Sequence, residues 1–93
     1  MDSYKVFETK SFQEDITQMD RGGVIKIKEK LQQYVYPQLK REPHFGPNIK
    51  KLKNWDPPTW RYRVGAWRFF YEIDDKEKLV YMIASDHRSR AYR

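Results

Sequence analysis

Three arginines, Arg61, Arg63 and Arg68, stand on either side of a Gly-Ala pair in the second half of the chain. A guanidinium group is planar and pairs with a phosphate through two parallel hydrogen bonds, so an array of arginines suits a phosphodiester backbone. Arginine stays protonated at neutral pH, with a pKa above ~12, and therefore neutralises charge without acting as a general base. Proton transfer beside such an array requires a different side chain.

The end of the chain supplies candidates for that proton transfer within a segment that also carries arginines: His87, Arg88, Arg90 and Tyr92. His87 is the best titrating group, because the ordinary pKa of histidine is near ~6.5. The hydroxyl of Tyr92 can donate a proton, and its ring can stack on a base. The plain alternatives are a strand-end histidine bonded to backbone and a terminal ring packed on the sheet.

A third basic group lies in residues 37–58, which contain all five prolines of the chain. This density of proline predicts irregular structure. Within it, Ile49 and Leu52 are expected to anchor a turn or short strand. Three lysines project from it: Lys50, Lys51 and Lys53.

The arginines lie on a predicted β-hairpin. Residues 60–64 and 67–73 are rich in aromatic side chains, and the Gly65-Ala66 pair between them fits a type II′ turn. Such a turn places Arg63 opposite Arg68. Alternation then assigns one face to the core, with Trp60, Tyr62, Val64, Trp67, Phe69 and Tyr71. The other face carries Arg61, Arg63, Arg68 and Phe70.

Like charges directly opposite each other destabilise a sheet, so the Arg63–Arg68 pairing is a local conflict of the kind found at functional sites. Residues 50–93 carry 11 Lys and Arg against 6 Asp and Glu, whereas residues 1–49 carry 8 against 7. One alternative is an ordinary solvated face that Glu72 and nearby acids offset. The asymmetry favours a face for a polyanion, with RNA first, and an anionic membrane or an acidic protein as further possibilities.

The remaining segments predict an α+β fold. Residues 4–8 and 79–85 are β-prone and are expected to be the first and last strands. The N-terminal half also predicts two helices, as an antiparallel pair. Ser11 and Glu14 fit a capping box that starts the first.

The first helix is expected to end at Asp20–Gly23. The second is expected to run from Val24 to Tyr36 with an apolar stripe of Val24, Ile27, Leu31, Tyr34 and Val35, and to stop before Pro37.

The composition predicts one domain, residues 1–93, without cofactor or metal. The chain has no cysteine, and its two histidines, His44 and His87, are far apart in sequence, so neither a disulfide framework nor a zinc cluster is expected. No apolar run approaches membrane-spanning length, and the N-terminus has no signal-peptide core. We therefore expect a cytoplasmic location and no membrane partner.

Residues 62–73 resemble the hairpin of the RelE/ParE superfamily of toxins from type II toxin–antitoxin pairs. The segment His87–Arg93 resembles the strand-end segment of that family, and Lys51-Leu52-Lys53 resembles the element before the hairpin. The order of the expected elements, strand–helix–helix–strand–strand–strand, also agrees.

The resemblance implies two N-terminal helices packed on a four-stranded antiparallel sheet, and an antitoxin that wraps and neutralises the toxin. RelE-like members cut mRNA in the ribosomal A site without a metal. ParE-like members keep the fold but poison DNA gyrase. By position, Arg68 and Arg88 match residues that stabilise the scissile phosphate, Tyr92 matches the C-terminal tyrosine, and His87 matches an acid–base histidine of other branches.

The expected function is therefore ribosome-dependent mRNA cleavage, with Arg68, Arg88, His87 and Tyr92 as catalytic residues. The expected RNA-binding residues are Arg61, Arg63, Lys50, Lys51, Lys53 and Arg90. Arg61 and Arg63 occupy the places of two lysines in the best-known RelE branch, and as arginines they cannot inherit a general-base role. A gyrase poison and a non-catalytic RNA- or partner-binding module stay open as alternatives.

Overall fold

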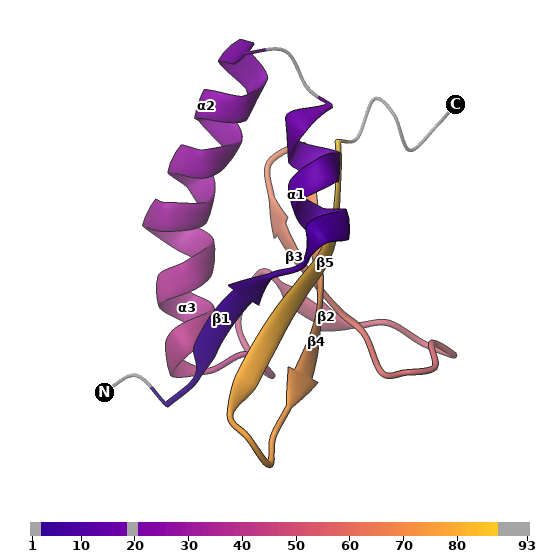
Figure 1. The fold of residues 1–93 in the computed structure, drawn as a ribbon. Coiled ribbons are helices and arrows are strands. Elements are labelled where there is room, and N and C mark those ends of the chain that lie inside the picture. Colours follow the sequence, from indigo (N-terminus) through magenta and orange to yellow (C-terminus); the bar gives the residue numbers. More distant parts are fainter. Residues whose placement is uncertain (1–2, 19–20, 88–93) are drawn as a thin grey trace.

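A five-stranded sheet forms the centre of the computed structural model, which describes residues 3–18 and 21–87 (Figure 1). The strands are β1 (Lys5–Glu8), β2 (Ile49–Lys51), β3 (Trp60–Val64), β4 (Trp67–Asp74) and β5 (Leu79–His87). Their order across the sheet is β1-β5-β4-β3-β2. β1 is parallel to β5 and the other pairs are antiparallel, so the sheet is not wholly antiparallel as expected. The segment expected as a turn or short strand forms β2, which raises the number of strands from the expected four to five.

The hairpin of β3 and β4 has the register predicted from the sequence. Val64 pairs with Trp67, and Arg63 pairs with Arg68. Gly65 has φ of +56°, and Ala66 is not among the described residues with positive φ. Positive φ at the first loop position alone is the signature of the type II′ turn, so the predicted turn is confirmed.

The helices begin and end elsewhere than the sequence predicted. α1 (Lys10–Thr17) is capped by Thr9, whose hydroxyl accepts from Phe12 N at 3.2 Å, and not by Ser11. The Thr9 hydroxyl also donates to Met82 O at 2.7 Å, so the tertiary contact with β5 selects the cap. α2 (Arg21–Lys30) contains Gly22 and Gly23, which were expected to lie between the helices. The predicted antiparallel course of the two helices is visible in Figure 1.

The second helix continues past Pro37. A π-helical turn, η1 (Leu31–Val35), joins α2 to α3 (Tyr36–Arg41), and Tyr36 N donates to Leu31 O. Pro37 stands in the first turn of α3, where a missing N–H costs little. The wider π turn accommodates the proline where a regular helix would clash, which corrects the predicted end at Tyr36.

The core lies between the helices and one face of the sheet. Its buried side chains include Phe12 and Ile16 of α1, Ile27, Leu31, Val35 and Leu39 of the second helical segment, and Tyr62, Phe69, Tyr71, Val80 and Met82 of the sheet. Tyr34, predicted on the apolar stripe, is 54% exposed. None of the helices in the described ranges is long and apolar enough to cross a membrane.

A β-bulge interrupts the pairing of β4 with β5. Phe70 pairs with Ala84 and Tyr71 with Met82, so Ile83 is an extra residue in β5. Beyond the bulge, Arg68 pairs with Asp86 and Trp67 with His87. Cross-strand partners share a face, so the bulge sets which side chains of the strand end accompany the arginines.

Candidate nucleic-acid interface

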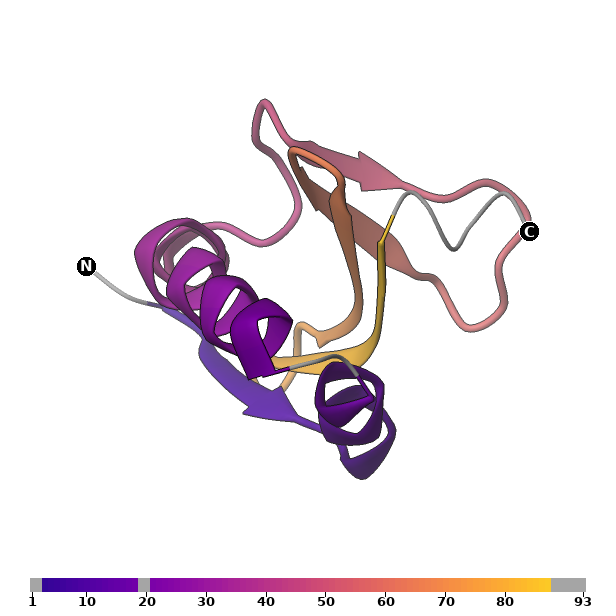
Figure 2. The same cartoon turned by 90° about the horizontal axis from the view of Figure 1, so that it is seen from above.

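The arginine face is the side of the sheet turned away from the core, and it carries Lys50, Arg61, Arg63, Arg68 and Phe70. Lys50 pairs with Arg61, and Arg61 pairs with Phe70, so one row crosses β2, β3 and β4. The face assignment predicted for the hairpin is confirmed, because Tyr62, Phe69 and Tyr71 are buried on the other side. Figure 2 shows β2 and β3 on the side of the molecule away from α2.

A hollow of about 530 Å³ opens beside this face, lined by Pro47, Asn48, Ile49, Lys50, Arg61 and Arg63. Arg61 Nε is covered and has no hydrogen-bond partner in the described part of the protein. A covered donor without an acceptor costs about 1–3 kcal/mol. The three cations that line the hollow make it suited to a phosphate.

A row of charged side chains crosses the arginine face near the β3–β4 turn. Arg68 stands between Arg63 on β3 and Asp86 on β5. The negative charge of Asp86 partly offsets the repulsion predicted between Arg63 and Arg68. The sequence had not predicted that Asp86 would lie beside these arginines. Arg63 Nε donates to Gly65 O at 3.4 Å, which holds its guanidinium near the turn.

An aromatic pair lies on the same face. The rings of Trp55 and Phe70 are stacked, with centroids 6.4 Å apart and an angle of 11° between the planes. Trp55 belongs to the loop of residues 52–59, which projects from the body of the molecule (Figures 1 and 2). Sequence reasoning missed Trp55, because only the course of this loop brings it over β4.

His87 lies on the core side of the sheet and not on the arginine face. Its ring is 4.5 Å from that of Trp67, edge to face at 70°, and the two residues are cross-strand partners. Arg68, one residue before Phe69 and one after Trp67, points to the opposite side. The structure therefore does not bring His87 and Arg68 together on one face.

The remaining predicted site residues are spread more widely. Lys51 lies on the core side, with Nζ 5.3 Å from the centre of the Trp60 ring. Lys53 is exposed in the loop beside Trp55. Arg88, Arg90 and Tyr92 lie outside the described residues.

A second titratable cluster, not predicted from the sequence, joins three distant segments. His44 Nδ1 lies 2.9 Å from Glu42 Oε2, and its Nε2 lies 2.8 Å from Asp75 Oδ1. Tyr4 OH donates to Asp75 Oδ1 at 2.7 Å. The cluster thus ties the start of the chain and the end of α3 to the β4–β5 turn.

The pKa values of the histidine and of the two carboxylates in this cluster move in the directions that favour their charged forms. Partial burial acts to lower the pKa of His44, but hydrogen bonds to Glu42 and Asp75 raise it above its ordinary value. Hydrogen bonds from His44 lower the pKa of Glu42, and those from Tyr4 and His44 lower the pKa of Asp75. Both ring nitrogens of His44 face carboxylates, so the arrangement requires an imidazolium. Within residues 3–18 and 21–87, no group of His, Cys, Asp and Glu is arranged to hold a metal ion.

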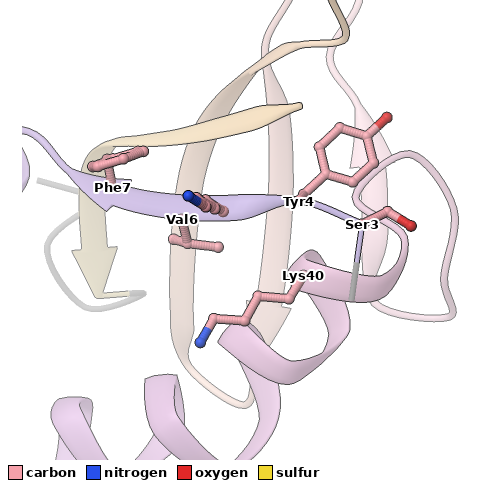
Figure 3. A pocket seen from close by; sticks show the side chains of 6 residues that line it. Ser3, Tyr4, Val6, Phe7 and Lys40 are labelled. Carbon is pink, nitrogen blue, oxygen red and sulfur yellow. The ribbon is translucent and has the colours of Figure 1, made fainter. Parts of the chain in front are cut away.

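A pocket of about 520 Å³ follows the open edge of β1 and is lined by Ser3, Tyr4, Lys5, Val6, Phe7 and Lys40. Figure 3 shows the Lys40 side chain reaching from α3 alongside Val6. Ser3 N and Tyr4 N both donate to Lys40 O at 2.9 Å, which closes one end of the edge. Beyond that point no strand within residues 3–18 and 21–87 pairs with the outer edge of β1, and this strand carries an exposed aromatic, Phe7, stacked on Tyr81.

Comparisons with known proteins give the family. A family model described as "ParE toxin of type II toxin-antitoxin system, parDE" matches residues 6–92. The chain is similar to one in the RelBE2 toxin–antitoxin complex from Mycobacterium tuberculosis, with 26% identity, a TM-score of 0.70, and coverage of 92% of this chain and 99% of that chain.

The fold is also that of the YoeB/ParE toxin from Agrobacterium tumefaciens, at 24% identity and TM-score 0.62, covering 89% of this chain and 96% of that one. A chain of the intact E. coli RelBE complex matches at 17% identity and TM-score 0.63, covering 90% and 95%. No curated protein sequence matches at a significant level. By the family model, which spans nearly all of the sequence, the chain belongs to the ParE toxin family of type II toxin–antitoxin systems, within the RelE/ParE superfamily.

Proposed function

We propose that this toxin is a ribosome-dependent, metal-independent mRNA endonuclease that inhibits translation. The observation that carries the proposal is the arginine face, where Lys50, Arg61, Arg63 and Arg68 share one side of the sheet beside a hollow. A row of fixed cations of this kind grips a phosphate backbone and stabilises charge that develops on a phosphate.

The proposed chemistry uses the nucleophile that RNA itself carries. The ribose 2′-hydroxyl attacks the phosphorus and gives its proton to a base, and the bond to the 5′-oxygen breaks as that oxygen receives a proton. The products are a 2′,3′-cyclic phosphate and a 5′-hydroxyl. Arg68 and Arg88 would neutralise the phosphorane, while Arg61, Arg63, Arg90 and the lysines at positions 50, 51 and 53 hold the strand.

Proton transfer is assigned to His87 and Tyr92 in this proposal. Because His87 faces Trp67, its participation requires the RNA to pass around the end of β5, or the imidazole to turn on binding. The assignment to His87 is therefore separable from the assignment of charge stabilisation to Arg68, and the two are tested by different variants.

A cognate antitoxin is the protein partner of this family, and several solved relatives are complexes with one. We propose that the antitoxin is acidic where it covers the arginine face, and that an amphipathic helix or strand of it packs on apolar surface beside the sheet and helices.

The experiment is inducible expression in bacteria followed by mapping of the 5′ ends of cellular mRNA. The proposal expects cuts at fixed positions within codons, abolished when translation is blocked before A-site filling. Intact mRNA with induced DNA damage would instead identify a gyrase poison, a candidate that the ParE description of the matching family model favours. If neither mRNA cuts nor DNA damage appeared, a non-catalytic binding module would be the function that is left.

A further inference from the structure

Trp55 is an exposed tryptophan held in a defined place. Leu52 N donates to Thr59 O at 2.9 Å and closes the base of the loop. Asn54, just before Trp55, adopts φ of +61°, a left-handed conformation that asparagine tolerates better than most residues. The backbone thus turns sharply enough for the indole to return over Phe70.

The indole of Trp55 is in contact with Phe70 and still open to solvent over more than half of its surface. Phe70 stacks on it in a nearly parallel, offset arrangement, while Trp55 as a whole is 54% exposed. A tryptophan needed only for packing would be expected to bury most of its area, because burial is the source of its stabilisation. The pair therefore presents a flat, preorganised aromatic surface to solvent.

The charges around this surface select the ligand. Phe70 is the cross-strand partner of Arg61 and is two residues from Arg68 on the same face. An aromatic platform flanked by arginines is the arrangement that binds single-stranded nucleic acid, since cations hold the backbone while bases stack on rings. An apolar protein partner would be disfavoured by the cost of removing these cations from water.

We propose that Trp55, supported by Phe70, is a base-stacking site that positions a nucleobase of single-stranded RNA while the arginine face holds its phosphates. This inference rests on the proposed function, because it names how the same face recognises RNA. It assigns recognition of a base to a loop residue outside the hairpin.

The test measures binding of a short single-stranded RNA to the full-length protein, and to Trp55→Ala and Trp55→Phe. Tyr34→Ala is the matched control, because Tyr34 is also 54% exposed but lies on the helical side. Trp55→Ala should weaken binding roughly tenfold, the effect of losing one stacked base. Trp55→Phe should retain most of the affinity, and Tyr34→Ala should change nothing.

A set of RNAs with one abasic position each then isolates the stacking. At the stacked position, wild type should bind the abasic RNA about as weakly as Trp55→Ala binds the intact RNA, and the variant should lose nothing further. If Trp55→Ala weakened the binding of the intact RNA and of every abasic RNA by the same factor, the inference would be overturned. Such a result would mean that the substitution damaged the loop and did not remove a base contact.

Failure of the inference and failure of the proposed function give different results. Salt-dependent RNA binding that is unaffected by Trp55→Ala would sink only the stacking site. Absence of RNA binding by wild type would overturn the stacking site, while the proposed function would still be decided by the mapping of mRNA 5′ ends. Normal RNA binding by Trp55→Ala combined with lost binding to purified gyrase would reassign the aromatic pair to a protein contact.

Discussion

His44 Nε2 lies 2.8 Å from Asp75 Oδ1, so an imidazole in the loop after α3 is joined to the turn between β4 and β5. Tyr4, Glu42, Asp75 and Lys78 are the titratable groups facing this site; Tyr4 donates to Asp75, and Lys78 Nζ lies 5.0 Å from the Tyr4 ring. The arrangement depends on a charged histidine and two charged carboxylates. It therefore has a defined range of pH in which it stabilises the fold.

The pH range follows from the directions of the pKa shifts. The raised pKa of His44 contributes stability that is complete below its ordinary value of ~6.5 and is lost as the pH rises through the folded-state pKa. The lowered pKa values of Glu42 and Asp75 contribute stability present above their ordinary values near ~4 and lost as the pH falls through the folded-state pKa values. Together they act most strongly between about pH 5 and 6.5.

We expect His44→Gln to lower the free energy of unfolding by about 1 kcal/mol or less in this range, because the pairs are partly exposed, and by less at pH 8. Denaturant unfolding of both proteins at several pH values measures the difference. Asp75→Asn is the control and should reduce the pH dependence without removing it. A difference between wild type and His44→Gln that is the same at pH 5.5 and pH 8 would contradict the charged state of His44.

Leu39→Ala should lower the free energy of unfolding by about 2–5 kcal/mol, because Leu39 is fully buried in α3. Lys40→Ala, the exposed neighbour, should change it by less than about 0.5 kcal/mol. Chemical denaturation of the two variants tests whether the helix after Pro37 packs on the core. Equal stabilities of the two variants would contradict the packing of α3 on the core and favour the irregular structure that the prolines predicted.

The parts of the fold that the sequence predicted are those set by neighbours along the chain. The two-residue Gly65-Ala66 loop determined which residues of the hairpin face each other, and alternation then separated the arginine face from the core. The continuation of the helix beyond Pro37 escaped prediction because a π turn relieves a clash that local rules treat as final. The choice of Thr9 over Ser11 as cap depends on a carbonyl of β5, seventy-three residues away along the chain.

The candidate site shows the same division. Arg61, Arg63, Arg68 and Phe70 could be placed on one face because they belong to one hairpin. The contact of Trp55 with Phe70, and that of His44 with Asp75, join segments whose meeting depends on the whole fold. The face of His87 was not predictable, because the bulge at Ile83 reverses the alternation of β5 before the strand ends.

Asp86→Asn should tighten RNA binding and lower stability, because it removes the acid opposite Arg68 and leaves two arginines facing each other. Arg63→Gln should do the reverse, raising the free energy of unfolding by about 0.2–1 kcal/mol while weakening RNA binding. RNA titrations and thermal unfolding of both variants check the opposite signs. Changes of the same sign in both variants would show that the row does not act through charge.

Arg68→Ala should abolish mRNA cleavage and toxicity while the protein stays folded, because Arg68 points away from the core. Its RNA affinity should also depend less on salt, with the slope of log K against log salt smaller by about 1. Single-turnover cleavage on ribosomes and binding at several salt concentrations provide the two readouts. Cleavage at the wild-type rate would remove Arg68 from the mechanism, and an unfolded product would contradict the face assignment.

His87→Gln should change the pH dependence of cleavage, because it removes the group proposed to transfer a proton, whereas Arg68→Ala should slow cleavage at every pH. Tyr92→Phe keeps the ring and deletes the hydroxyl, so it separates proton donation from stacking. The measurement is single-turnover cleavage with a defined A-site codon. If His87→Gln cleaves at full rate with an unchanged profile, His87 serves to pack on Trp67, and Lys50 on the arginine face becomes the better candidate for the base.

The extra residue at Ile83 divides β5 into two lengths whose side-chain alternation differs by one residue. Before Ile83, the side chains of Val80 and Met82 lie in the core; after it, Asp86 lies on the arginine face. Because the two lengths no longer share one alternation, a substitution at the functional end of the strand does not have to respect the pattern that keeps the other end buried. The molecule can therefore change what it offers to a ligand at this edge while the half of the strand that holds the fold together stays the same.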